Sequence, residues 1–135
     1  NHAHIHEAVY DSNTIDRLQL RSHILANNLE LLKDFPVAIL FATQADMDQF
    51  NYQKGDTEGL VNVALSVEGV KVAVFFSEQA DKVKISFRSK GDYVVNELAS
   101  SHFSGGGHKY ASGGVSFLSL DETISNFKQV VPNFF

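Results

Sequence analysis

The sequence predicts an α/β domain, with helices on the faces of a mixed sheet of about four or five strands. Segments with helical periodicity alternate with short apolar runs that are typical of buried strands. One segment, "KVKISFRS", alternates strictly between apolar and polar residues, as a half-buried strand does. The 135 residues are 44% hydrophobic and 20% charged, which is typical of a single globular domain with its own core.

The first predicted element is a long helix from an N-cap at Asn13 to about Lys33, where the approaching Pro36 stops it. Its apolar residues form two opposite stripes, one through Ile15 and Leu18 and the other through Leu20 and Ile24. A helix with two apolar faces is usually buried on both sides. We therefore expect its second face to meet another domain or subunit.

A buried strand over 37–43 and a short helix or turn over 44–50 are predicted next. The loop "KGDTEG" then leads into a helix over about 60–65. Within this loop Asp56 and Glu58 fit an N-cap and a first-turn acid of that helix. The alternative is that Asp56, Thr57 and Glu58 face a cleft.

The second half is predicted to contain a strand hairpin, a helix, a glycine-rich loop, a strand and a final helix. The hairpin strands are "GVKVAVFFSE" and "DKVKISFRSK", and the helix follows over 92–103. The strand "VSFLSL" and a helix capped by Asp121 close the chain.

Composition excludes several kinds of site. There is no cysteine, which excludes disulfides, thiolate metal sites and cysteine nucleophiles, and fits a reducing, cytoplasmic location. No apolar run is long enough to span a bilayer, and no membrane partner is expected. The net charge of −5 argues against a general nucleic-acid binder. Five cations nevertheless outnumber two acids in 82–110, and this local excess favours an anion-binding patch: Lys82, Lys84, Arg88, Lys90 and Lys109 against Asp92 and Glu97.

The stretch "SHFSGGGHKYASGG", 101–114, contains five of the nine glycines. Consecutive glycines expose backbone N–H groups and permit positive φ, as in an anion-binding nest, and a helix starting at His108 would add its dipole. Arg88 offers a planar fork suited to phosphate. The alternative is a flexible connection whose glycines only permit a tight crossing. The spacing fits neither a P-loop nor a dinucleotide-binding fingerprint, and the chain contains no H-E-x-x-H or G-x-S-x-G motif.

Three segments, "KGDTEGLVNVALSVEGVKVAVFFSE", "KISFRSKG" and "VNELASSHFSGGGHKYASGG", together resemble the DHH-associated domain of DHH-family phosphoesterases. The bacterial nanoRNase/pAp phosphatase branch is the group most similar to them. The resemblance extends from about Glu7 to the C-terminus, so that 1–12 is interpreted as a linker or N-terminal extension and 13–135 as the domain.

The resemblance implies a substrate-binding role for this domain. In the family, an Asp-His-His domain holds two metal ions, usually Mn²⁺, which activate water for attack on a phosphate ester. The GGGH loop and a strand arginine of the second domain contact the substrate. The matching residues here are Arg88, Ser89, Gly105, Gly106, Gly107 and His108, with Asp56, Thr57, Glu58, Lys90 and Lys109 as further cleft residues.

No Asp-His-His motif occurs in the chain, so the metal-binding domain is expected to be absent from it. We expect no catalytic residue, no metal and no cofactor in this chain, and no hydrolysis by it alone. The expected partners are a short RNA or nucleotide, the chain's own DHH domain and a second copy in a homodimer. The alternating His2, His4 and His6 fit either a metal array or a frayed terminus. The functional alternatives are a cyclic-dinucleotide phosphodiesterase, an exopolyphosphatase-related hydrolase, and a nucleotide- or RNA-binding module without catalysis.

Overall fold

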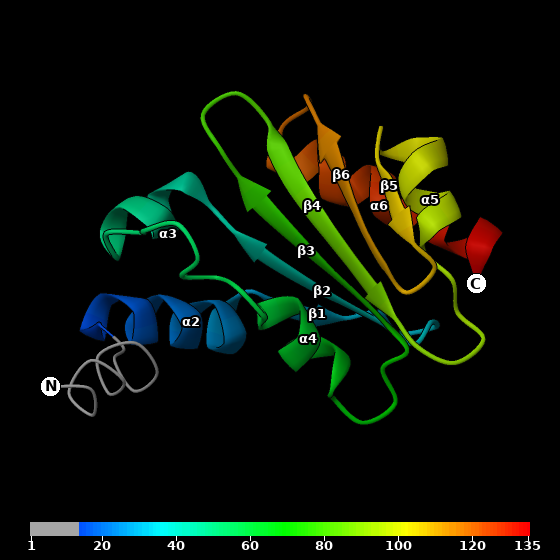
Figure 1. Cartoon of the computed structure of the whole chain (residues 1–135), viewed down its shortest axis with the longest axis horizontal. Helices are drawn as coiled ribbons and strands as arrows, with labels where there is room; N and C mark the ends of the chain where they lie inside the picture. The colour runs from blue at the N-terminus through cyan, green and yellow to red at the C-terminus, as the bar shows by residue number, and fades with distance from the viewer. Residues whose placement is uncertain (1–13) are drawn as a thin grey trace, which may run out of the picture.

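The computed structural model describes residues 14–135, which form one mixed sheet between two layers of helices (Figure 1). The six strands lie in the order β1-β2-β3-β4-β6-β5, and β2 and β3 are the one parallel pair among them. The α/β class is confirmed, with more strands than the four or five predicted. The predicted linker 1–12, the Asn13 cap and the three alternating histidines lie outside the described residues.

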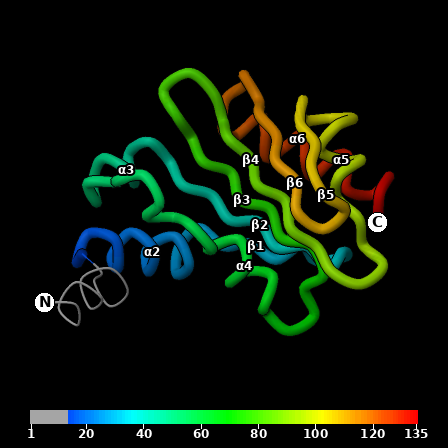
Figure 2. Tube along the Cα trace, in the orientation of Figure 1, coloured from blue at the N-terminus to red at the C-terminus, as the bar shows by residue number. Residues whose placement is uncertain are grey.

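Figure 2 traces the path of the chain through these strands and helices, from the N-terminus to the C-terminus. Their bounds are α2 Ile15–Asn27, β1 Leu29–Leu31, β2 Val37–Ala42, α3 Gln44–Gln49, α4 Leu60–Leu65, β3 Val72–Glu78, β4 Val83–Ser89, α5 Asn96–His102, β5 Gly106–His108, β6 Ala111–Ser116 and α6 Leu120–Phe134. No helix in this part of the chain is both long and apolar enough to cross a bilayer.

Each face of the sheet has its own core. On one face the alternating residues Val83, Ile85 and Phe87 of β4 pack with α5 and α6, as the pattern of that strand predicted. On the other face α2 and α4 pack over β2 and β3, where the inward residues include Ala38, Leu40 and Phe75. The second helical layer therefore covers only part of its face, because the apolar residues that hold it belong to β2 and β3.

The long first helix was predicted to end at about Lys33, but it ends about six residues earlier, at Asn27. Asn28 donates a side-chain hydrogen bond to Asp46 Oδ2 at 2.9 Å, and its carbonyl accepts from Phe41 N at 3.2 Å. These contacts turn the chain, so that Leu29–Leu31 pairs with β2 as an edge strand. This additional strand depends on tertiary contacts that the helical pattern could not reveal.

The two faces of α2 differ in burial. Leu20 and Ile24 are fully buried, whereas Ile15 is 64% exposed and Leu18 is 47% exposed. Within the described chain, α2 therefore buries one apolar face and exposes the other. The interpretation that the outer face meets another domain or subunit stays a prediction.

Four predicted helix starts are also corrected. Thr14 caps α2 and Ser119 caps α6, where Asn13 and Asp121 were expected. Gly59, with φ of 82°, precedes α4, so Asp56 and Glu58 do not cap that helix. The helix predicted over 92–103 is shorter, Asn96–His102.

The glycine-rich segment was predicted as a loop but forms a β-hairpin. Gly106–His108 is an edge strand that pairs antiparallel with β6, and no helix starts at His108. The predicted contribution of a helix dipole is therefore wrong. The strand expected over 115–120 lies earlier, at Ala111–Ser116, because it pairs with β4 through its glycines.

Candidate functional site

On the α2 and α4 side of the sheet, α4 contacts β4, but no helix of the described chain packs over β6 and β5 (Figure 1). Directly paired residues of neighbouring strands point to the same face, so the register identifies which residues this face presents. We call this surface the open half-sheet and define it by Lys84, Ser86, Arg88, Gly106, His108, Ala111, Gly113 and Val115. It contains two cations, one histidine and no carboxylate.

The predicted residues Arg88 and His108 belong to one row of the open half-sheet. Ala111 of β6 pairs with Arg88 on one side and with His108 on the other. Two strand spacings of about 4.8 Å place their backbones about 10 Å apart. His108 is exposed and Arg88 is half-buried, so the two side chains can approach one ligand from opposite sides.

The neighbouring row places two glycines side by side. Gly113 pairs with both Ser86 and Gly106, and both glycines are exposed. Their missing side chains leave a bare strip of backbone beside Arg88 and His108. As an edge strand, β5 also leaves part of its N–H and C=O groups outside the sheet ladder.

The five glycines of the segment have two different reasons to be glycine. A Cβ on Gly105 would lie 1.8 Å from Gly113 O, and one on Gly114 would lie 2.7 Å from Phe103 O. Gly107 is similarly crowded, at 2.8 Å from Ala111 O. These three positions need glycine for close chain crossing, as the flexible-connection alternative proposed.

Gly106 and Gly113 are not explained by crowding. A Cβ on Gly106 would meet no atom within 4 Å, and one on Gly113 would make an ordinary 3.6 Å contact with Ile85 O. Neither has the positive φ that restricts a position to glycine. Internal packing would therefore accept a side chain at both, and a ligand that must approach the backbone gives a reason for their absence.

The Arg88 guanidinium lies along the sheet. Its Nη1 donates to Phe87 O at 2.8 Å and, more weakly, to Ser112 O at 3.5 Å. The ion pairs within 14–135 do not include Arg88, so no carboxylate there neutralises its charge. A guanidinium held only by carbonyls keeps donors for an anion.

The predicted Ser89 does not join this surface. It follows Arg88 on β4 and its side chain therefore points to the opposite face, where it is 5% exposed. Ser89 Oγ has no hydrogen-bond partner among residues 14–135, while Ser89 N donates to Tyr110 O at 3.0 Å. Its backbone thus anchors the β5–β6 turn, and its hydroxyl is turned away from the other predicted residues.

The loop before α4 is held by α2, which sequence reasoning missed. Arg17 Nη1 donates to Gly55 O at 3.0 Å, and Arg21 Nη1 donates to Asp56 O and Glu58 O at 3.1 and 2.7 Å. Burial and the neighbouring Arg17 lower the pKa of Arg21, and Asp56 raises it. Because these bonds go to backbone carbonyls, residue type within the loop gives no signal of them.

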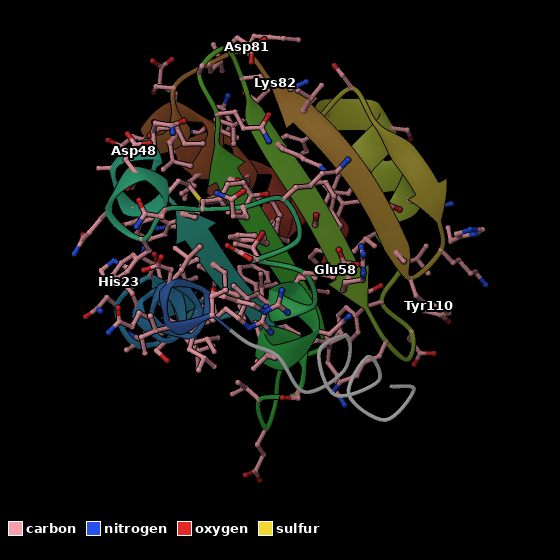
Figure 3. The ribbon with its side chains drawn as sticks, turned by 60° about the vertical axis from the view of Figure 1, so that its left-hand side comes forward. His23, Asp48, Glu58, Asp81, Lys82 and Tyr110 are labelled. Atoms are coloured by element: carbon pink, nitrogen blue, oxygen red, sulfur yellow. The ribbon has the colours of Figure 1, made fainter. Side chains whose placement is uncertain are left out.

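The three predicted cleft residues of that loop differ in burial and in what they contact. Asp56 is buried; its Oδ2 accepts from Gln53 N at 2.8 Å, and its Oδ1 lies 3.9 Å from Arg17 Nη1, so its carboxylate holds the loop and ties it to α2. Thr57 is half-buried and Glu58 is exposed. In Figure 3 Glu58 lies in front of the lower half of β4, which α4 contacts. Glu58 is thus the acid of this loop that can face a ligand on the open half-sheet.

The predicted cationic patch is divided. Lys84 and Arg88 lie on the open half-sheet, but Lys82 and Tyr110 lie at opposite ends of β4 and β6 in Figure 3. Lys90 Nζ donates to Leu65 O at 3.0 Å and so binds the C-terminal end of α4. Lys109 is exposed in the β5–β6 turn beside Tyr110. The alternation of β4 already indicated that Lys84 and Ser86 share a face with Arg88.

Nothing in the described part of the chain is suited to the metal ions that the resemblance implies. Within 14–135 no three His, Cys, Asp or Glu side chains group in a way that could hold a metal ion. The chemistry of the open half-sheet is instead that of anion binding, with a guanidinium, an imidazole, a lysine and bare backbone.

The fold is that of an α/β domain in which a guanidinium, an imidazole and a lysine lie on one face of the sheet. The chain belongs to the DHHA1 domain family, whose pattern matches residues 34–134. Over 91 residues it is 35% identical to the bifunctional oligoribonuclease and PAP phosphatase NrnA of Bacillus subtilis, covering 67% of this chain and 28% of that protein. It is 36% identical over 104 residues to a probable bifunctional oligoribonuclease and PAP phosphatase NrnA of Streptococcus mutans, covering 76% of this chain and 32% of that protein.

A solved structure is similar over almost the whole chain. An exopolyphosphatase-related protein from Bacteroides fragilis superposes with a TM-score of 0.89 at 35% identity, covering 99% of this chain and 39% of that one. The predicted resemblance and the DHH-associated domain fold are confirmed. The chain spans less than a third of either curated relative, so the activity of a whole enzyme is a matter for proposal.

Proposed function

We propose that this chain is the substrate-binding domain of a metal-dependent DHH-family phosphoesterase that hydrolyses short oligoribonucleotides and 3′-phosphoadenosine 5′-phosphate (pAp). The observation that supports this most strongly is the open strip of Gly106 and Gly113, flanked by Arg88 and His108 in the next row. The NrnA relatives, which are similar over two thirds or more of this chain, support the choice of substrate.

Each group of the surface has a distinct part in binding. The bare backbone lets a phosphate approach closely enough for N–H groups to bind it. The Arg88 fork supplies two parallel donors and a full charge, and His108 approaches from the β5 side. These groups position the phosphate and offset negative charge as it develops during the reaction. In this proposal the metal ions, which would activate the attacking water, belong to the DHH domain.

A polyphosphate substrate is the second candidate, because the similar Bacteroides fragilis protein is described as exopolyphosphatase-related. Both substrates would use Arg88 and His108, since both present phosphate oxygens. They differ in the nucleobase and ribose, which a polyphosphate lacks.

Binding can be tested on the purified chain by titrating it with pAp, with 5′-phosphorylated dinucleotides and with tripolyphosphate. Arg88→Ala and His108→Ala should each weaken binding of pAp and the dinucleotides by about tenfold or more. Lys33→Ala is the matched control, because Lys33 is exposed and follows β1, at the far edge of the sheet. Unchanged affinity in both site variants would contradict the proposed site. Tight binding of tripolyphosphate alone would favour the second candidate.

Catalysis is tested separately, by incubating the chain with Mn²⁺ and the dinucleotide pApA and measuring release of mononucleotide. We expect no turnover by this chain and turnover when a DHH domain is joined to it. Hydrolysis by the chain alone would contradict the division of roles between the domains.

A further inference from the structure

The open half-sheet extends beyond the row of Arg88 and His108. Four residues along β4, on the same face, the exposed Lys84 pairs with Val115. At about 3.3 Å per residue, the backbones of Arg88 and Lys84 are about 13 Å apart. This separation corresponds to roughly two phosphate-to-phosphate steps of an extended single strand, such as those that follow basic grooves on other proteins.

The surface between these two cations is open. Gly106 and Gly113 form its middle row with the hydroxyl of Ser86, and neither glycine has a side chain to obstruct a strand. None of the residues that define the open half-sheet is acidic. A chain of phosphates that crossed from Arg88 to Lys84 would thus meet backbone and one hydroxyl of the sheet, with Glu58 of the loop before α4 as a neighbouring acid.

An exposed aromatic residue lies at the Lys84 end. Phe117 directly follows β6, whose last residue, Ser116, pairs with Val83. The residue is 76% exposed, the highest value among the exposed large apolar residues of the described chain. Burial in the core does not explain a phenylalanine in this position. Phe117 lines a hollow with Glu78, Asp81 and Lys82 of the β3–β4 turn, so its immediate neighbours carry both signs of charge. Exposed aromatic side chains along a groove that binds the phosphate backbone stack nucleobases without regard to sequence.

We propose that the open half-sheet binds a single-stranded oligonucleotide beyond its terminal nucleotide, with Lys84 contacting the third phosphate and Phe117 stacking a base at that end. This inference rests on the proposed function, since it takes the first phosphate to be at Arg88 and His108. It makes the domain sensitive to substrate length. A 5′-phosphorylated trinucleotide reaches Lys84, whereas pAp and a 5′-phosphorylated dinucleotide do not.

The test measures the affinity of this chain for pAp and for 5′-phosphorylated di-, tri- and tetranucleotides at several salt concentrations. Lys84→Ala should reduce the slope of log affinity against log salt by about 0.7 for the tri- and tetranucleotides, because one phosphate contact is lost. The slope for pAp and the dinucleotide should stay unchanged. Lys33→Ala, a lysine at the far edge of the sheet, should change none of the slopes.

Phe117→Ala gives an independent readout. It should weaken trinucleotide binding by about fivefold or more while leaving the salt slope unchanged, because stacking involves no counterion release. Tripolyphosphate binding should not respond to this variant. If Lys84→Ala reduces the salt slope while Phe117→Ala leaves the affinity for the trinucleotide unchanged, the assignment of a nucleic acid is overturned and the ligand is a bare polyanion.

The outcomes also separate this inference from the proposed function. If Arg88→Ala weakens every ligand while Lys84→Ala leaves the trinucleotide slope unchanged, only the extended surface is overturned. If Arg88→Ala has no effect on any ligand, the proposed function itself fails. Each variant should unfold at the same temperature as the unaltered chain, because Lys84 and Phe117 are both exposed.

Discussion

Replacing Gly106 with alanine separates ligand binding from folding more cleanly than any other change at this site. The new methyl group would meet no atom within 4 Å, so the fold accepts it. It would nevertheless project onto the open half-sheet, between the backbone and an approaching phosphate. The matched control is Gly105→Ala, one residue earlier, where the methyl group would lie 1.8 Å from Gly113 O.

The two variants should behave in opposite ways. Because glycine is more flexible when unfolded, Gly106→Ala should raise the free energy of unfolding by about 0.4–1 kcal/mol. Losing one charge-assisted hydrogen bond between phosphate and backbone should cost about 1.5–3 kcal/mol of binding, which is roughly 10- to 150-fold in affinity. Gly105→Ala should instead lower the free energy of unfolding by about 1–3 kcal/mol or more, because backbone must move.

The assays are urea unfolding followed by circular dichroism, and titration of the folded protein with pAp. Gly106→Ala should unfold at an equal or higher urea concentration than the unaltered chain and bind pAp more weakly. Undiminished pAp affinity in Gly106→Ala would refute the explanation of this glycine. A large loss of stability in the same variant would refute the steric argument on which it depends.

Further predictions concern the scaffold. Asp46 accepts hydrogen bonds from Thr43 and Asn28, and its carboxylate lies 2.9 Å from the His23 ring. Burial raises the pKa of Asp46, but these partners outweigh burial and hold the pKa below its ordinary value. A lowered carboxyl pKa stabilises the fold above the unfolded pKa of about 4 and loses that effect as pH falls through the folded pKa. The stability difference between the unaltered chain and Asp46→Asn should therefore shrink below about pH 4 in urea titrations; a difference that is constant from pH 7 to 3 would contradict this. Arg21→Met should accelerate amide hydrogen exchange at Asp56 and neighbouring loop residues while leaving exchange in β3 unchanged, and equal rates in the loop would show that the Arg21 bonds do not hold it. Phe127→Ala should cost about 3–5 kcal/mol in urea unfolding, because this fully buried ring packs against three other phenylalanines, and a loss under 1 kcal/mol would contradict the described core.

The sequence by itself determined the α/β class and the orientation of β4. Strict alternation on that strand places Lys84, Ser86 and Arg88 on one face, because side chains of a strand point alternately to its two sides. The same rule, applied one residue further, turns Ser89 to the opposite face, where it is buried. The family resemblance placed Ser89 with Arg88 among the substrate-binding residues, and that role of Ser89 stays a prediction.

Only the tertiary structure decided which glycines are open and what lies beside them. Gly105, Gly106 and Gly107 are identical in the sequence, yet crowding by β6 explains the first and third and not the second. Likewise His108 joins Arg88 because both strands pair with Ala111, and Leu29–Leu31 becomes a strand because Asn28 binds Asp46. Strand register and chain crossings are set by contacts between residues far apart in the sequence, whereas local periodicity reports only the direction in which each side chain points.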